Sequence, residues 1–449
     1  MPKKSKILNG LADMIDEESK INDIEFEDIM SDAEFIHDFA IEFDEVTDKR
    51  EPGYVLHSLE SIMLTVIFAL FSKCNTFEEI YLFMNRHYEW LDKYVGYENG
   101  KPSKSAIQRV VAFVNSKELE NVCLRVLSKF LTKNRSIYKD KKIEIDDIKS
   151  MDGKTANSSN RKKSKSGKVA KMNAMSIYSL KNEFCEATEF ISDKTNEIPT
   201  GIELLKRVNI KNCVITFDAM STQINTIEYI ASNHSYYVAP VKGNQKNLEE
   251  NISEYFKDEK LKKKAKKENC IRVIEKAHGV PETRECIFTN DIEWLAFKDN
   301  WKDLKSIGIM TRTYEKDGKE VKDTRYYISN IAAEHIQLLY NSIRGEWKIE
   351  NQLHYYLDMV FKEDKNKTFL ENSQKNLNII RKFCLAILKM FKEKRKLSMN
   401  SIRFCISLDF EKEIDSIIKD LYSNKYFLCN LIIVKSAFVI LSCIFIFTR

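Results

Sequence analysis

The chain has 449 residues, of which 43% are hydrophobic and 31% are charged. This balance is typical of a soluble globular protein with two or three domains, and the scarcity of glycine (12) and proline (6) argues against repeats or long flexible linkers. The ten cysteines form no C-x-x-C pair and no N-terminal signal peptide is recognisable, so we expect reduced thiols in a cytoplasm and no paired-cysteine metal site.

The net charge of +5 hides an asymmetry along the chain. Residues 11–50 contain fifteen acidic and three basic residues, a local charge of −12, so the remainder carries +17. A basic body of this size favours a polyanionic partner such as a nucleic acid, because each neutralised phosphate releases counterions; a solubilising surface is the alternative. We therefore expect an acidic leader over residues 1–50, either a solvated face or a cover for the basic surface.

A helical pattern follows the acidic segment. Ser58 is placed to cap an apolar helix over residues 61–71, and Thr76 opens a second helix. After a Gly-Lys-Pro turn, Ser103 can cap a third helix. These signals predict a small helical domain over residues 51–135.

The character of the sequence changes near residue 142, where strand-like and helix-like segments begin to alternate. The order is three strands, helix, strand, helix, strand, which is the order of a ribonuclease H-like α/β domain. The predicted strands are 142–151, 171–180, 184–192, 212–217 and 236–241, and the predicted helices are 202–208 and 222–232. Later strands are predicted at 271–275, 283–289, 306–314 and 324–330, and later helices at 333–341, 345–361 and 372–390.

The predicted fold class is therefore α/β, with a ribonuclease H-like catalytic core, a β-rich insertion and a small helical domain before the core. The core is expected over residues 140–395, with the insertion at about 251–332. Residues 396–449 are expected to form a C-terminal extension. Its tail over residues 426–447 is apolar and long enough to span a bilayer, but Lys435 near its middle would be costly in lipid. A buried terminal helix or strand, or a read-through extension, is favoured, and no membrane partner is expected.

Three acidic residues stand where rigid elements can present them together. Asp152 and Asp218 each follow a predicted strand, and these two strands are neighbours in a ribonuclease H-like sheet. Glu350 lies on the late helix that follows the insertion. Each residue alone has an ordinary explanation as a turn residue, a helix cap or a solvated carboxylate. Together they predict a metal site, because two-metal phosphodiester cleavage needs carboxylate oxygens on rigid elements.

Short motifs occur in a fixed order over residues 55–390. They are His57-Ser58-Leu59, Gly100-Lys101-Pro102-Ser103 with Arg109-Val110, Met151-Asp152-Gly153-Lys154, Thr216-Phe217-Asp218-Ala219, Val241-Lys242-Gly243-Asn244-Gln245, His278-Gly279 with Glu282-Thr283-Arg284, Trp347-Lys348-Ile349-Glu350-Asn351-Gln352-Leu353-His354, Leu357-Asp358, Glu363-Asp364, and Asn376-Leu377 with Arg381. Each is weak alone. In this order they resemble the DDE transposases of bacterial insertion sequences, and most of all the H-repeat-associated group with its N-terminal transposase-associated domain.

This resemblance implies that Asp152, Asp218 and Glu350 are the catalytic, metal-binding triad. It implies two Mg²⁺ ions, which Mn²⁺ can replace, hydrolysis of phosphodiester bonds at transposon ends, and attack of the freed 3′-hydroxyl on target DNA. The expected partner is double-stranded DNA, at both the transposon ends and the target, bound by a homo-oligomer of the chain. The expected location is the bacterial cytoplasm, at the nucleoid when bound to DNA.

Basic and amide side chains near the carboxylates are the candidate DNA contacts. They are Lys154, Arg161, Lys162, Lys163, Lys165, Lys242, Asn244, Gln245, Arg344 and Lys348. The basic, serine-rich stretch over residues 161–171 is either a loop that follows the phosphate backbone or a solvated loop, and both alternatives stay open.

The match departs from the family's C-terminal signature of an aromatic residue, a basic residue, the glutamate and a lysine. The departing positions hold Ile343, Glu346 and Leu357. Glu346 lies one helical turn before Glu350, so both carboxylates share a helix face and repel each other without a metal. Three functions stay open: an active transposase, a decayed or domesticated DNA-binding copy without transposition activity, and an unrelated carboxylate enzyme such as a sugar hydrolase, which no motif supports.

Overall fold

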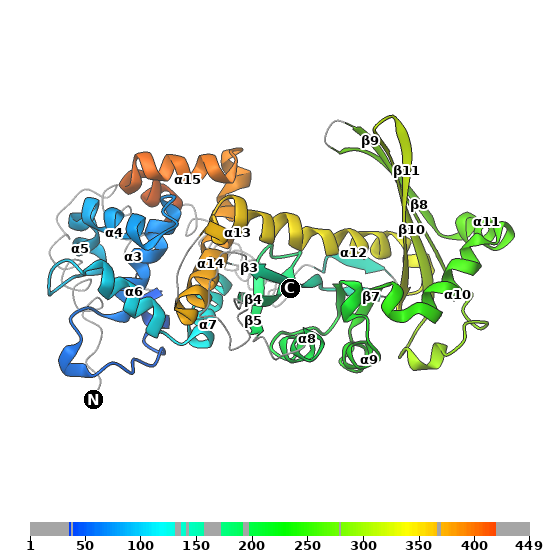
Figure 1. Ribbon diagram of the computed structural model, residues 1–449, viewed down its shortest axis with the longest axis horizontal. Helices are drawn as coiled ribbons and strands as arrows, with labels where there is room; N and C mark the ends of the chain where they lie inside the picture. The colour runs from blue at the N-terminus through cyan, green and yellow to red at the C-terminus, as the bar shows by residue number, and fades with distance from the viewer. Residues whose placement is uncertain are drawn as a thin grey trace, which may run out of the picture. The chain divides into compact units, whose positions relative to one another are not determined.

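The computed structural model describes residues 36, 39–130, 136–140, 143–156, 172–191, 197–277, 280–365 and 370–418. Within these residues the chain folds into two compact units (Figure 1). The helical unit comprises the described parts of Met1–Lys133, Ala156–Lys171 and Tyr356–Arg449. The sheet unit comprises the described parts of Asn134–Thr155 and Met172–Tyr355.

The helical unit begins with helices whose starts follow the predicted caps. The side chains of Ser58, Thr76 and Ser103 each accept a hydrogen bond from a backbone N–H in the first turn, and Thr76 completes a reciprocal capping box with Glu79. These three helix starts are confirmed. The elements are η1 (Pro52–Tyr54), α3 (Leu59–Phe71), α4 (Phe77–Arg86), α5 (Tyr88–Val95), α6 (Lys104–Phe113) and α7 (Ser116–Ser128).

The C-terminal part of the helical unit packs against these helices. It contains η7 (Glu363–Lys365), α14 (Glu371–Arg395) and α15 (Met399–Leu408). Asn376 of α14 donates to the carbonyls of Val111 and Val114 at 2.7 and 2.8 Å, which joins α14 to the end of α6. Fully buried Arg403 of α15 donates to the carbonyl of Leu70. Contacts therefore group α14 with the N-terminal helices. The predicted extent of the catalytic domain, to residue 395, stays a prediction.

The sheet unit is built on nine hydrogen-bonded strands in the order β5-β4-β3-β6-β7-β11-β10-β9-β8. The strands are β3 (Asp147–Ala156), β4 (Met172–Ser179), β5 (Cys185–Ile191), β6 (Cys213–Phe217), β7 (Tyr236–Val241), β8 (Cys270–Ala277), β9 (Val280–Thr289), β10 (Ser306–Lys316) and β11 (Lys319–Ser329). A small separate pair is formed by β1 (Tyr138–Asp140) and β2 (Ile143–Ile145). The predicted adjacency of the first and fourth core strands is confirmed, because β3 and β6 pair in parallel.

The predicted insertion strands are also present, and they join the central sheet. Strand β11 pairs antiparallel with β7, with Tyr326 opposite Val241, so β8 to β11 extend the central sheet. This pairing provides hydrogen-bond partners for the backbone N–H and C=O groups along the edge of β7. The first part of the expected insertion is helical: α10 (Lys246–Lys257) is followed by α11 (Glu259–Glu268), which carries the lysine run.

Helices cover both faces of the sheet, as Figure 1 shows for α8 and α9 on one side and α12 on the other. Because side chains alternate along a strand, Ile215 and Phe217 of β6 join one apolar cluster and Val214 joins the other. The first cluster lies under α8 (Glu197–Leu205), α9 (Ile224–Ser232) and α10. The second lies under α12 (Ile336–Ile349), through residues such as Leu339 and Ile343.

Short helical segments connect the main elements of the sheet unit. They are η2 (Ala219–Ser221), η3 (Gly243–Gln245), η4 (Lys298–Asn300), η5 (Ala333–His335), the π-helical turn η6 (Glu350–His354) and α13 (Tyr355–Met359), at which the chain enters the helical unit. Among the described residues no helix is both long and apolar enough to cross a bilayer. The apolar tail at 426–447 lies outside the described residues.

Gly345 allows α12 to approach the sheet closely, and this yields a stability prediction. A Cβ at this position would lie 2.7 Å from Cδ2 of Leu180 and 3.1 Å from Cγ2 of Ile148. We expect Gly345→Val to lower the free energy of unfolding by about 1–3 kcal/mol through overpacking, measured by urea unfolding followed by circular dichroism. The control is Gly53→Val, since no atom lies within 4 Å of a Cβ built there; its effect should stay within about 0.5 kcal/mol. Equal stabilities of the two variants would contradict this account of the packing.

Candidate metal centre

Two carboxylates follow directly paired positions on neighbouring parallel strands. Met151 of β3 is in register with Phe217 of β6, so Asp152 and Asp218 come next on each strand. Met151 and Phe217 are buried in the cluster under α8 and α9. Because side chains alternate, the two aspartates face the opposite side of the sheet, which α12 covers. The carboxylate of Asp218 also accepts a hydrogen bond from the backbone N–H of Ser221 at 3.2 Å, which caps η2.

The third carboxylate comes from the end of α12, where the helix widens into the π-helical turn. Glu350 begins this turn and His354 ends it. Nδ1 of His354 lies 3.6 Å from Oδ2 of Asp152 and 3.5 Å from Oε2 of Glu350. One ligand atom from each of the three residues lies within 4.8 Å of the others. Single π turns inside helices are often found at functional sites.

The charges of this cluster are incompletely balanced. Burial raises the pKa of Asp152 to about 7, and the charges of Glu350 and Asp218 add to that rise. The contact with His354 instead lowers the pKa of Glu350. Glu350 is the more exposed residue of this contact. Nε2 of His354 is buried and has no hydrogen-bond partner among the described residues. The cluster therefore holds negative charge that a cation would stabilise.

The donor set fits a divalent metal ion. Carboxylate oxygens of Asp152 and Glu350 are hard ligands suited to Mg²⁺ or Mn²⁺, and an imidazole nitrogen suits Mn²⁺ among other transition metals. Asp218 lies outside the 4.8 Å group, but it is close enough to Asp152 to raise the pKa of that residue. The structure thus brings Asp152, Glu350 and His354 together and places Asp218 beside them.

Glu346 lies near Asp218, one helical turn before Glu350. Burial raises the pKa of Glu346 to about 7; Asp218 adds to the rise, and Arg325 and Lys242 oppose it. Its Oε1 is 4.0 Å from Nη1 of Arg325, beyond hydrogen-bond reach. Its Oε2 is buried without a hydrogen-bond partner among the described residues.

The predicted DNA contacts occupy different surroundings. Asn244 and Gln245 donate to the carbonyls of Ala219 and Thr222 at 2.7 and 3.1 Å, so their amides anchor the segment that follows Asp218. Lys242 and Lys348 are exposed.

Two other predicted contacts lie close to acidic side chains. The positive charge of Lys154 contributes to lowering the pKa of Glu350. Nη2 of Arg344 lies 3.9 Å from Oε2 of Glu275. Arg161, Lys162, Lys163 and Lys165 lie outside the described residues, as do His278 and Gly279. The DNA-binding roles of all these residues stay predictions.

His354 is the member of the cluster that sequence reasoning did not select. It was recognised only as the last residue of the motif around Glu350. Its signal was its spacing: residues four apart on a helix share a face, so a histidine four positions after a predicted ligand is itself a candidate ligand.

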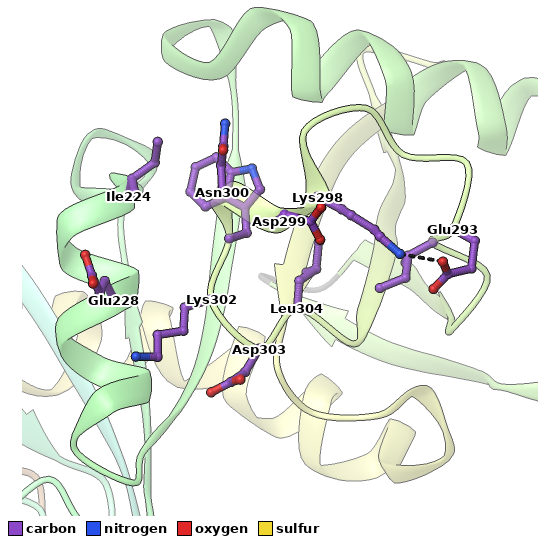
Figure 2. A pocket seen from close by; sticks show the side chains of 11 residues that line it. Ile224, Glu228, Glu293, Lys298, Asp299, Asn300, Lys302, Asp303 and Leu304 are labelled. Carbon is purple, nitrogen blue, oxygen red and sulfur yellow. Dashed lines mark hydrogen bonds and ion pairs between the residues drawn. The ribbon is translucent and has the colours of Figure 1, made fainter.

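A separate hollow lies between α9 and the segment over residues 292–304 (Figure 2). Its walls carry charges of both signs, including Glu228 and Lys302, and Lys298 pairs across one side with Glu293 at 2.5 Å. None of the clustered carboxylates lines it. The candidate metal centre is therefore separate from this pocket.

Comparison with known proteins matches both units of the chain. A family model described as "DDE_Tnp_1-associated" matches residues 41–126, and one described as "Transposase DDE domain" matches residues 143–387. "Putative protein YbfL" of Escherichia coli (strain K12) is 30% identical over 357 residues, which cover 77% of this chain and 90% of that protein.

Two further relatives carry transposase names. "Putative transposase YncI" of Escherichia coli O157:H7 is 28% identical over 369 residues, covering 80% of this chain and 90% of that protein. "H repeat-associated putative transposase YhhI" of Escherichia coli (strain K12) is 29% identical over 357 residues, covering 77% and 90%. Since the transposase DDE domain model matches more than half of the sequence, the chain belongs to the DDE transposase family.

Proposed function

We propose that this chain is a DNA transposase that hydrolyses phosphodiester bonds at transposon ends and joins the freed 3′-hydroxyl to target DNA. The observation that carries the proposal is the convergence of Asp152, Glu350 and His354 within 4.8 Å, beside Asp218 on the neighbouring strand. The strand order β5-β4-β3-β6-β7 supports a ribonuclease H-like core, because it is the order expected for that fold. Family membership supports the reaction class.

The proposed cofactor is a pair of Mg²⁺ ions, which Mn²⁺ can replace. When bound, such ions activate the attacking oxygen and stabilise the leaving oxygen at neutral pH. Asp152, Asp218 and Glu350 would hold these ions, and the charges of both Glu350 and Asp218 act on the carboxyl group of Asp152. His354, buried beside Asp152 and Glu350, is a further candidate ligand of this centre.

The proposed DNA surface surrounds this centre. Lys242 and Lys348 are exposed, while Lys154 and Arg344 are partly exposed, so these side chains can reach phosphate oxygens. We also infer that the chain acts as a homo-oligomer on double-stranded DNA, in the cytoplasm at the nucleoid, because two transposon ends must be joined to one target.

One observation favours a second candidate function. Glu346 occupies a position at which the resembled family carries a basic residue, and this adds a negative charge where DNA would approach. A decayed or domesticated copy would bind DNA in a salt-sensitive way but would not cut it.

The first test concerns the triad. We expect Asp152→Asn, Asp218→Asn and Glu350→Gln each to reduce Mg²⁺-dependent nicking of a duplex carrying the element's terminal repeats by about a thousandfold, since each loss weakens a metal contribution of several kcal/mol. Gel assays of nicking measure the rates, and Glu228→Gln on α9 is the charge-matched control. If one triad variant cuts at the wild-type rate, that residue is not part of the triad. If the wild-type chain binds the duplex without cutting it, the decayed-copy alternative replaces the proposal.

The second test uses the pKa of Asp152. Because this pKa is raised to about 7, the carboxyl holds a proton below that pH, and the proton competes with a metal ion. We therefore expect the affinity for Mn²⁺ to increase as pH rises from about 5.5 to about 8, with the main change near 7. Isothermal titration calorimetry at several pH values measures the dissociation constants. An affinity that does not change across this window would contradict the raised pKa.

A further inference from the structure

Among the described residues, Glu346 is a carboxylate beside the candidate metal centre that the DDE triad does not use. It lies on α12, one helical turn before Glu350, so both side chains emerge on the same helix face. The backbone carbonyl of Glu346 lies 3.5 Å from Oγ of Ser150, two residues before Asp152 on β3. This turn of α12 therefore lies directly over the strand that carries Asp152.

One oxygen of the Glu346 carboxylate, Oε2, has no hydrogen-bond partner among the described residues. The side chain is 17% exposed, and this oxygen is buried. Leaving such a group unpaired costs free energy, so natural sites supply a hydrogen bond or a cation. The nearest cation, the guanidinium of Arg325, is 4.0 Å away and stacks over the ring of Trp347, with 4.7 Å to the ring centroid.

We propose that Glu346 is a fourth carboxylate ligand of the metal centre, on the side of Asp218, so that this chain holds its ions with four carboxylates rather than three. The inference rests on the proposed function. The charges support it, since four carboxylates match the charge of two divalent ions, and Asp218 and Glu346 interact electrostatically. In this arrangement Glu346 and Asp218 would hold one ion together, as Glu350 and Asp152 would hold the other.

A purely structural role predicts something different. If Glu346 only attracts Arg325, it joins α12 to β11 and contributes to stability but not to metal affinity. Glu346→Gln and Arg325→Gln would then both lower the melting temperature and leave metal binding unchanged.

The test is a Mn²⁺ titration of the full chain at pH 8, by calorimetry and by electron paramagnetic resonance of unbound Mn²⁺. We expect Glu346→Gln to raise the dissociation constant of one Mn²⁺ ion by about tenfold or more. The dissociation constant of the other ion should stay within about twofold of the wild-type value. The affinity of Glu346→Asp should lie between those of Glu346→Gln and the wild type. The metal-free melting temperature should not fall in Glu346→Gln, and the Mn²⁺-induced rise in melting temperature should shrink. Glu228→Gln is the charge-matched control and should behave as wild type.

The outcomes separate this inference from the proposed function. If Glu346→Gln binds Mn²⁺ within twofold of the wild-type affinity while Asp152→Asn binds it more weakly, Glu346 is not a ligand. The triad would then stay in place. Unchanged binding by Asp152→Asn as well would overturn both. If Glu346→Gln and Asp152→Asn both bind Mn²⁺ more weakly, and Arg325→Gln binds it with the wild-type affinity, four carboxylates hold the ions.

Discussion

The candidate site depends on one physical constraint, the placement of several carboxylates where the protein itself supplies too little positive charge. Burial and neighbouring charges raise the pKa of both Asp152 and Glu346 to about 7. A fold that only needed stability would avoid this arrangement, because uncompensated buried charge is destabilising. We propose that bound divalent cations offset this cost, which would couple the local structure of the site to the proposed chemistry.

The fold produces this concentration of charge by simple means. The parallel pairing of β3 and β6 makes Asp152 and Asp218 neighbours, and strand alternation turns both toward α12. Gly345 lets α12 lie close to the sheet, and the π-helical turn then presents Glu350 and His354 toward Asp152. Each step places a carboxylate on a regular element packed against an apolar cluster, which limits how far the groups can move apart when they repel.

Local signals predicted the parts of the structure that depend on neighbouring residues. Helix caps at Ser58, Thr76 and Ser103 were recognisable because capping is a short-range interaction, and the buried strand before Asp218 was recognisable from its apolar run. The adjacency of β3 and β6 followed from the order of elements and the resemblance, since periodicity alone does not specify which strands pair.

Features that depend on long-range contacts were not predicted. The insertion strands join the central sheet because β11 pairs with β7, and α14 packs with the N-terminal helices through contacts such as that of Asn376 with Val111. The burial of Oε2 of Glu346 and the approach of His354 to Asp152 also arise from packing between distant segments. In the sequence Glu346 is conspicuous only as a departure from a motif, whereas the lack of a hydrogen-bond partner for its Oε2 among the described residues is a property of the folded chain.

The most direct test of the central claim is a crystal structure of the full chain grown with Mn²⁺, in which anomalous scattering locates the ions. The account predicts two peaks about 4 Å apart, each within roughly 2.3 Å of carboxylate oxygens, with Asp152 contacting both, Glu350 contacting one and Asp218 the other. Anomalous peaks elsewhere on the chain, or none at these carboxylates under saturating Mn²⁺, would contradict it.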